Sequence, residues 1–341
     1  MDNITRRKFG ARLLRMSGAV LPLYPFKFAE GSAKASEEKT GFPSYLRLFR
    51  EGVLARRARE LQAYYENCSL CPRDCRVDRM RGELGKCRAP ATLKVSSAFP
   101  HFGEERPLVG SKGSGTIFFS HCGLRCIYCQ NHAISLEGEG VAVTEERLAE
   151  TMIKLQRMGC HNINLVTPTH YVPGIVRALE LAVPQGLRIP LVYNTGGYEK
   201  TEVLRLLEGI VDIYLPDFKY MDSAHSAAYS SEAYNYPHYA RMAFKEMYRQ
   251  VGGLQMGNAG IARRGLMIRH LVLPNRLADT REVLTFIVRE LSPSCYVNIM
   301  RQYRPEHKAR DFSELARRIT GREYRETLEW AEELGMKVPF R

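Results

Sequence analysis

The chain has 341 residues, of which 45% are hydrophobic and 26% are charged, a balance typical of a globular protein rather than of a disordered or fibrous one. Beyond residue 41 no run of eighteen apolar residues occurs, so the sequence predicts no transmembrane helix. Lys and Arg total 50 against 37 for Asp and Glu, which gives a formal net charge of +13. A nucleic-acid partner stays open, but the basic residues are scattered, which is more typical of a solvated surface.

Residues 1–41 resemble either a basic tail or a twin-arginine export signal. Residues 5–9 read Thr-Arg-Arg-Lys-Phe, a modest apolar stretch covers 16–28, and Ala-Lys-Ala at 33–35 fits a small-residue cleavage site. Against a signal, Arg15 and two prolines interrupt the hydrophobic region. Both interpretations stay open.

The next segment, 42–110, is predicted to hold a helical lead-in and a cysteine-rich knuckle. Apolar residues spaced like one face of a helix occupy 42–66. Residues 68–90 carry four cysteines and are punctuated by proline and glycine, which indicates a loop.

From residue 111 to residue 341 short apolar strands alternate with helices, which predicts parallel pairing with both faces of the sheet covered. Periodicity alone does not separate a partial barrel from an open, doubly wound sheet. The expected strands are 116–120, 162–166, 191–193, 211–215, 266–273 and 296–300. The expected helices are 144–158, 172–183, 199–207, 240–251, 280–291 and 322–334.

Polar residues follow every expected strand. In parallel α/β folds the reactive groups gather at the carboxyl ends of the strands, so a site is expected at that edge. The residues concerned are His121 and Cys122, 167–170, 194–197, 217–219, Pro274 and Asn275, and Arg301 and Gln302.

Three cysteines lie in the loop after the first of these strands, in the pattern Cys122-x3-Cys126-x2-Cys129. Three thiolates can ligate three irons of a [4Fe-4S] cube, whereas electron-transfer clusters usually use four cysteines. The missing fourth ligand indicates that another molecule binds the open iron. Zinc held by these cysteines and His121 or His132 is the alternative, but the position after a first parallel strand favours a cluster.

Residues 121–131, His-Cys-Gly-Leu-Arg-Cys-Ile-Tyr-Cys-Gln-Asn, resemble the signature loop of the radical S-adenosylmethionine (radical SAM) superfamily. Within that superfamily the chain is similar to the branch of pyruvate formate-lyase activating enzyme. The segments that carry this narrower likeness are 129–131, 162–169, 214–222 and 269–274.

The resemblance runs from about Tyr65 to the C-terminus and implies a partial (β/α)6 parallel barrel that binds S-adenosylmethionine over a [4Fe-4S] cluster. It implies an oxidoreductase that cleaves this cofactor into methionine and a 5′-deoxyadenosyl radical for hydrogen abstraction, with a low-potential electron donor as partner. In the activating-enzyme branch the substrate is a protein that receives a glycyl radical. A peptide, RNA or metabolite substrate stays open.

The resemblance also assigns cofactor contacts to residues near the strand ends. Many members carry a Gly-Gly-Glu turn against the methionine moiety; this chain has Thr167-Pro-Thr169 there, so the role passes to the threonine hydroxyls. Asp217 and Lys219 match the family's Asp-x-Lys, with Lys219 expected to meet the methionine carboxylate. The implied cofactor-binding set is Tyr128, Thr167, Thr169, Asn194, Asp217 and Lys219. For the strand-end Asp and Asn, helix capping is the plainer role.

The earlier cysteines follow the pattern Cys68-x2-Cys71-x3-Cys75-x11-Cys87 and have enough thiols to close a tetrahedral site. Zinc and an auxiliary iron–sulfur cluster both suit four cysteines, and the spacing does not decide between them. A structural role is the plainer expectation for this group.

A non-enzymatic protein is the alternative to a radical enzyme: a metal-stabilised binding or electron-transfer protein with a basic surface. It would have no affinity for S-adenosylmethionine. A cytoplasmic location is favoured because reductant and S-adenosylmethionine are found there, with periplasmic location by twin-arginine export as the alternative.

Overall fold

The computed structural model describes residues 42–336 of the chain. The segment 1–41, to which the tail or export signal was assigned, lies outside the described residues. Within the described part no helix is long and apolar enough to cross a membrane.

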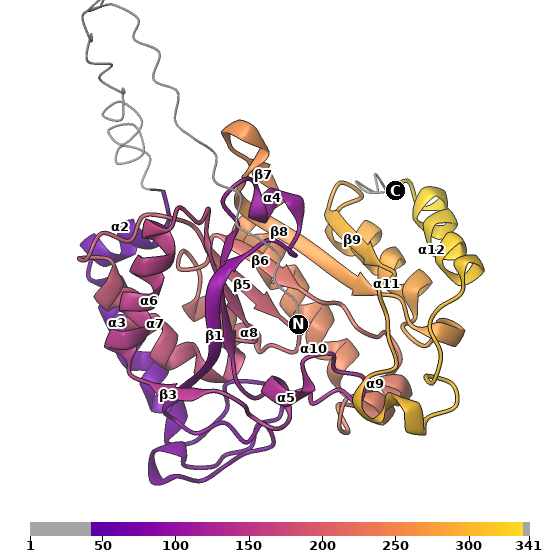
Figure 1. The fold of residues 1–341 in the computed structure, drawn as a ribbon, viewed down its shortest axis with the longest axis horizontal. Coiled ribbons are helices and arrows are strands. Elements are labelled where there is room, and N and C mark those ends of the chain that lie inside the picture. Colours follow the sequence, from indigo (N-terminus) through magenta and orange to yellow (C-terminus); the bar gives the residue numbers. More distant parts are fainter. Residues whose placement is uncertain (1–41, 337–341) are drawn as a thin grey trace, which may run out of the picture. The chain divides into compact units, whose positions relative to one another are not determined.

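A sheet with six parallel strands forms the centre of the fold (Figure 1). Its strands pair in the order β2, β4, β5, β6, β8 and β9, and no pairing joins β2 to β9, so the sheet stays open as a partial barrel. This confirms the expected (β/α)6 architecture and all six expected strands. The strands are β2 (Ser114–Phe119), β4 (Ile163–Val166), β5 (Leu191–Thr195), β6 (Ile213–Pro216), β8 (Ala262–Leu271) and β9 (Tyr296–Met300).

Helices cover the sheet as the alternating pattern predicts. In Figure 1, α3, α6 and α7 lie together beside the sheet, and α7 contacts both of the other two. The longer helix α10 contacts β6 and β8. The helices are α2 (Tyr45–Arg50), α3 (Val53–Gln62), α4 (Arg106–Val109), α5 (His132–Ser135), α6 (Glu145–Arg157), α7 (Val172–Ala182), α8 (Thr201–Leu206), α9 (Ser223–Tyr229), α10 (Tyr236–Val251), α11 (Thr280–Phe286) and α12 (Gly321–Glu333). A π-helical turn, Ile287–Leu291, extends α11.

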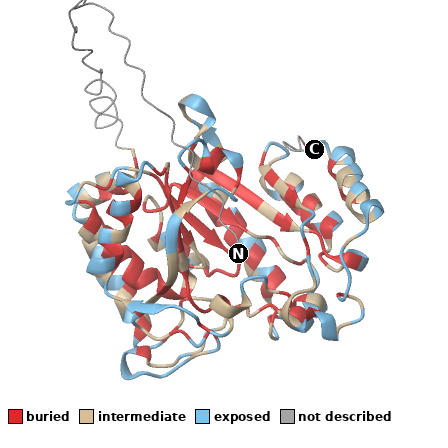
Figure 2. Ribbon diagram, in the orientation of Figure 1, coloured by how far each residue is buried: buried red, intermediate tan, exposed pale blue. Residues whose placement is uncertain are grey.

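Burial explains why these short runs become strands. Every residue of β5 and of β6 is buried, and Figure 2 shows the central strands in red. A strand hidden on both faces needs apolar side chains on both, which is the continuous apolar pattern in the sequence. Burying one Leu or Ile side chain contributes roughly 1.5–3 kcal/mol.

Three antiparallel strands extend this sheet and were not expected from the sequence: β1 (Leu93–His101), β3 (Val141–Val143) and β7 (Gln255–Met256). The first runs alongside β2 and lies inside the segment predicted to be lead-in and knuckle. Pro100 interrupts its pattern, because proline cannot donate a backbone hydrogen bond. The structure accommodates Pro100 because β3 pairs only with the first three residues of β1.

Candidate functional site

The cluster loop, residues 121–131, joins the carboxyl end of β2 to α5 and carries Cys122, Cys126 and Cys129. His121 and Arg125 have left-handed backbone angles (φ 74° and 51°), which let the loop turn tightly. Cys126 is buried, and burial together with the charge of Cys122 raises the pKa of its thiol to about 11. The thiols are therefore close enough to influence one another.

Among residues 42–336 no three His, Cys, Asp or Glu side chains are already arranged to hold a metal ion. The three thiols of the cluster loop are therefore not preassembled around a single point. The donor chemistry fits an iron–sulfur cluster, because three soft thiols follow one another within eight residues at a sheet edge. Metal binding would also remove the thiol protons that burial retains.

Serine hydroxyls contact two of the three cysteines. Ser230 Oγ lies 3.0 Å from Cys126 Sγ, and Ser135 Oγ lies 3.0 Å from Cys129 Sγ. The segment that carries Ser230 also holds the loop backbone, since the Ile127 N–H donates to the Tyr229 carbonyl at 3.0 Å.

Four charged or polar side chains connect the ends of β5, β6 and β8. Asp217 accepts hydrogen bonds from Arg269 Nε at 2.7 Å and from Lys219 Nζ at 2.9 Å. Arg269 Nη2 also donates to Asn194 Oδ1 at 2.6 Å. Burial favours the neutral carboxyl, but the charges of Arg269 and Lys219 outweigh it and lower the pKa of Asp217 to about 2. Three of the predicted residues, Asn194, Asp217 and Lys219, are therefore brought together.

Arg269 was missed as a site residue by the sequence reasoning. It connects Asp217 to Asn194 and pairs with Glu104 at 3.3 Å. The available signal was a single arginine inside the apolar run Leu-Met-Ile-Arg-His-Leu, because a charge in a buried strand requires partners.

Thr167 and Thr169 line a small cavity together with Cys122 and Cys71. Thr167 has a left-handed backbone (φ 58°), and the Thr169 hydroxyl donates to Glu199 Oε1 at 2.6 Å. The cavity measures about 20 Å³, so it admits a water-sized group, and a larger ligand has to displace the side chains around it.

Glu199 is a second residue that the sequence reasoning missed. It is fully buried, and its carboxylate oxygens accept hydrogen bonds from the hydroxyls of Thr169, Thr195 and Tyr193. Burial raises its pKa to about 7, although the hydroxyl donors act in the opposite direction. The signal in the sequence was the glutamate of Gly-Gly-Tyr-Glu, which follows directly after a buried strand, where apolar packing does not account for a carboxylate.

Tyr128 lies away from this cavity. Its side chain is buried, its hydroxyl is 2.5 Å from that of Tyr220, and its ring packs against Tyr220 and Tyr303. It is not among the side chains that line the cavity with Cys122. Its expected contact with the cofactor stays a prediction.

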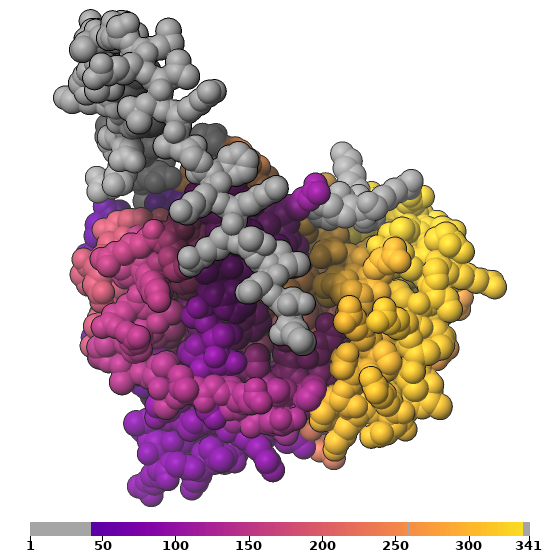
Figure 3. Space-filling model, viewed as in Figure 1, coloured from indigo at the N-terminus to yellow at the C-terminus, as the bar shows by residue number. Residues whose placement is uncertain are grey.

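The knuckle cysteines form a separate group that packs on the cluster loop. Burial, and the charges of Cys87, Cys68 and Cys75, raise the pKa of the Cys71 thiol, so the four thiols share one electrostatic environment. Backbone N–H groups donate to two sulfurs, from Lys86 to Cys75 at 3.3 Å and from Ala89 to Cys87 at 3.4 Å. Figure 3 shows the purple part of the chain, to which this segment belongs, at the lower surface.

Arg73 ties the knuckle to the cluster loop. Its Nε donates to the Gly123 carbonyl at 2.9 Å and its Nη2 to the Ser230 carbonyl at 2.8 Å. Cys71 also lies close to the loop, since a Cβ built on Gly123 would come within 3.7 Å of its sulfur.

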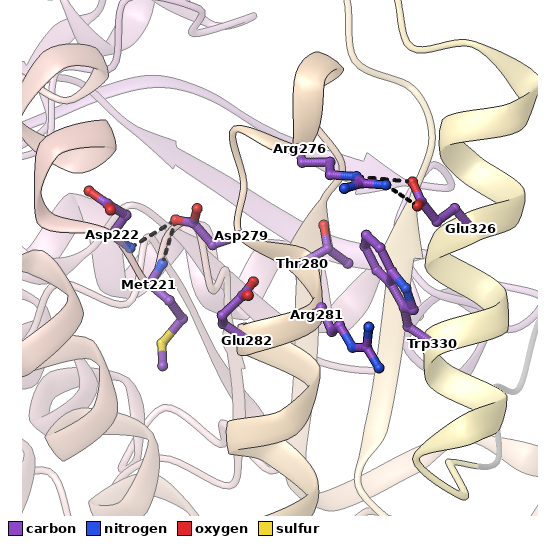
Figure 4. Close-up of a pocket in the computed structure, with 9 residues that line it drawn as sticks. All are labelled: Met221, Asp222, Arg276, Asp279, Thr280, Arg281, Glu282, Glu326 and Trp330. Atoms are coloured by element: carbon purple, nitrogen blue, oxygen red, sulfur yellow. Dashed lines mark hydrogen bonds and ion pairs between the residues drawn. The ribbon is translucent and has the colours of Figure 1, made fainter.

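A larger cavity, of about 560 Å³, lies between α11, α12 and the start of α9 (Figure 4). Two of its charged groups have partners on the opposite side: Arg276 binds Glu326, and Asp279 accepts hydrogen bonds from the backbone of Met221 and Asp222. No cysteine lines this cavity, so it has no donor suited to an iron–sulfur cluster.

Comparison with known proteins places residues 116–249 in the Radical SAM superfamily; this range begins within β2, ends within α10 and includes the cluster loop. The chain is also 32% identical over 286 residues to the uncharacterized protein MJ0674 of Methanocaldococcus jannaschii. That alignment covers 81% of this chain and 77% of the relative.

Proposed function

Because the chain contains a radical SAM superfamily domain, we propose that Cys122, Cys126 and Cys129 hold a [4Fe-4S] cluster with which the protein reductively cleaves S-adenosylmethionine. The observation that carries the proposal is the three-cysteine loop at the carboxyl end of the first parallel strand, inside the matched domain. When bound, the cluster and S-adenosylmethionine together supply a 5′-deoxyadenosyl radical that abstracts hydrogen from a substrate.

Lys219 and its partners bind and orient in this proposal. The Lys219 ammonium is mostly buried, and its positive charge favours the thiolate form of Cys126. Asp217 holds Lys219 in place while Lys219 keeps donors free for the carboxylate of a methionine moiety. Arg269 in turn binds Asp217 and Asn194, so hydrogen bonds connect the three strand ends around the Lys219 ammonium.

The threonine hydroxyls are positioned by Glu199. Thr169 and Thr195 both donate to Glu199, which orients their oxygen lone pairs as acceptors. Gly196 lets the Leu124 side chain of the cluster loop pack beside them, since a Cβ on Gly196 would come within 2.6 Å of that side chain. These residues favour a polar, cationic ligand part against the loop and exclude bulk water from it.

Product analysis after anaerobic reconstitution tests the proposal. Dithionite and S-adenosylmethionine should yield 5′-deoxyadenosine with the wild-type protein and none with Cys126→Ala. Cys160→Ala removes a buried thiol that lies outside both cysteine groups, so it should retain the product. Loss of product in both variants, or its persistence in Cys126→Ala, would count against the ligand assignment. A non-enzymatic metal protein would give no product in any of them.

The narrower proposal is that the substrate is a protein that receives a glycyl radical. Its support is the likeness of residues 129–131, 162–169, 214–222 and 269–274 to pyruvate formate-lyase activating enzyme. Incubating the reduced enzyme with a candidate protein labelled with deuterium at glycine should place deuterium in 5′-deoxyadenosine. Unlabelled product would exclude that protein as the hydrogen donor.

For the knuckle we propose a bound metal, either one zinc ion or a second iron–sulfur cluster. Its support is the shared environment of the thiols and the backbone N–H groups that donate to sulfur, which stabilise thiolates. Metal analysis of anaerobically purified protein distinguishes these alternatives. Zinc retained in Cys126→Ala and lost in Cys75→Ser assigns zinc to the knuckle, whereas zinc absent from both excludes it there.

We also propose that the protein acts in the cytoplasm, where reductant and S-adenosylmethionine are found. Fusion of residues 1–39 to a reporter tests this. Export of the reporter would contradict it.

A further inference from the structure

Three buried hydroxyl groups form a chain that ends on a cysteine of the cluster loop. Tyr128 OH lies 2.5 Å from Tyr220 OH, Tyr220 OH lies 3.1 Å from Ser230 Oγ, and Ser230 Oγ lies 3.0 Å from Cys126 Sγ. Ser230 and Tyr220 are fully buried and Tyr128 is 6% exposed. Bulk water therefore does not compete for these hydrogen bonds.

The chain is fixed in place from both sides. Arg73 holds the Ser230 carbonyl, and the adjacent Tyr229 carbonyl accepts the Ile127 N–H of the cluster loop. The Tyr220 ring packs edge-on against both Tyr128 and Tyr236. The backbone of Ser230 is therefore held beside the cluster loop.

Ligation of iron sets the direction of every hydrogen bond in the chain. A thiolate bound to iron has no proton, so it can only accept, and Ser230 must donate its single O–H to Cys126. The Ser230 oxygen is then left as an acceptor for Tyr220, and Tyr220 as an acceptor for Tyr128. Each donor is polarised by the next, and all three O–H groups point toward the cluster.

We propose that this hydroxyl chain raises the reduction potential of the cluster by stabilising negative charge on Cys126 Sγ, and that Ser135 does the same at Cys129. The inference rests on the proposed function, because it requires the cluster. Reduction adds one negative charge, part of which resides on the thiolates, so a donor stabilises the reduced form more than the oxidised form. Tyr128, the tyrosine beside the last cysteine, then acts on the cluster through Tyr220 and Ser230 as a positioning residue.

Ser135 provides independent support, since it approaches a different cysteine from a different element. It lies at the end of α5, is 8% exposed, and its hydroxyl is 3.0 Å from Cys129 Sγ. Two of the three thiolates in the loop thus receive a buried serine hydroxyl.

A redox titration followed by electron paramagnetic resonance, without S-adenosylmethionine, tests the proposal. Ser230→Ala should shift the cluster potential to a more negative value, Tyr220→Phe should shift it in the same direction by less, and Ser230→Thr, which keeps the hydroxyl, should restore it. Resonance Raman should show stronger Fe–S(Cys) bonds in Ser230→Ala, because a hydrogen bond to sulfur weakens them. A merely structural hydroxyl would move neither quantity.

A wild-type potential in Ser230→Ala with the cluster in place would overturn the proposal. If Ser230→Ala loses its cluster, Tyr220→Phe decides, and an unchanged potential there overturns it. Failure of the proposed function is recognised separately: a wild-type protein that binds the cluster but forms no 5′-deoxyadenosine still permits the comparison of potentials. A wild-type protein without any cluster overturns both.

Discussion

Replacing Glu199 by glutamine should stabilise the protein above neutral pH. In the wild-type protein burial raises the Glu199 pKa from 4.5 to about 7. The folded state therefore prefers the neutral carboxyl, and the stability that this provides is complete below pH 4.5 and lost as the pH rises through about 7. At 1.36 kcal/mol per pKa unit the difference corresponds to about 3 kcal/mol.

Glu199→Gln keeps an acceptor oxygen for Thr169 and Thr195 but cannot ionise. The gain in unfolding free energy over wild type should grow by about 2 kcal/mol between about pH 5.5 and about pH 8. Urea unfolding of anaerobically purified protein at both pH values measures it. The matched control is Glu202→Gln, at an exposed position in α8. It should change the unfolding free energy by about 1 kcal/mol at most.

This reasoning would be refuted if Glu199→Gln and wild type differed in unfolding free energy by the same amount at both pH values. It would mean that Glu199 is ionised in the folded protein throughout, held by its three hydroxyl donors, with burial the weaker influence. A carbonyl infrared band that titrates near neutral pH in wild type and is absent from Glu199→Gln would show the proton directly.

Two further predictions concern residues that hold the site together. Arg73→Ala should destabilise the protein by about 2 kcal/mol or more, because it removes hydrogen bonds from a charged group to Gly123 and Ser230. It should also increase the rate of cluster loss on dilution into chelator, measured by absorbance. An unchanged rate of cluster loss would show that the knuckle does not support the loop. Asp217→Asn should weaken S-adenosylmethionine binding at least tenfold, because Lys219 and Arg269 lose the carboxylate that positions them. Equilibrium dialysis measures this affinity. An unchanged affinity would show that Asp217, Lys219 and Arg269 are not part of the binding site.

The parallel strands were predictable because a strand that is buried on both faces appears in the sequence as a short, continuous apolar run. Residues 213–216 form a short, apolar run between Asp212 and Asp217, and parallel pairing gathers the polar residues that follow such runs at one edge. The N-terminus of α6 was equally clear, because the Thr144 hydroxyl accepts from the Arg147 N–H and two glutamates follow it. The cysteine loop could be placed at the strand end for the same reason.

Pairings between distant residues were not predictable. Nothing near Arg269 in sequence shows that its partners are Asp217, 52 residues away, and Asn194, 75 residues away. Likewise the position of Tyr128 beside Cys129 does not reveal that its ring turns into the core toward Tyr220. Side-chain direction in an irregular loop depends on tertiary packing, which no local pattern records.

The central claim is that a three-thiolate cluster in the loop leaves one iron open to S-adenosylmethionine. Electron paramagnetic resonance of the dithionite-reduced protein, recorded with and without S-adenosylmethionine, tests it most directly. The account predicts a [4Fe-4S]⁺ signal that changes shape when S-adenosylmethionine is added and is absent from Cys126→Ala. Zinc in the loop, or a spectrum in which no [4Fe-4S]⁺ component both responds to S-adenosylmethionine and disappears in Cys126→Ala, would contradict it.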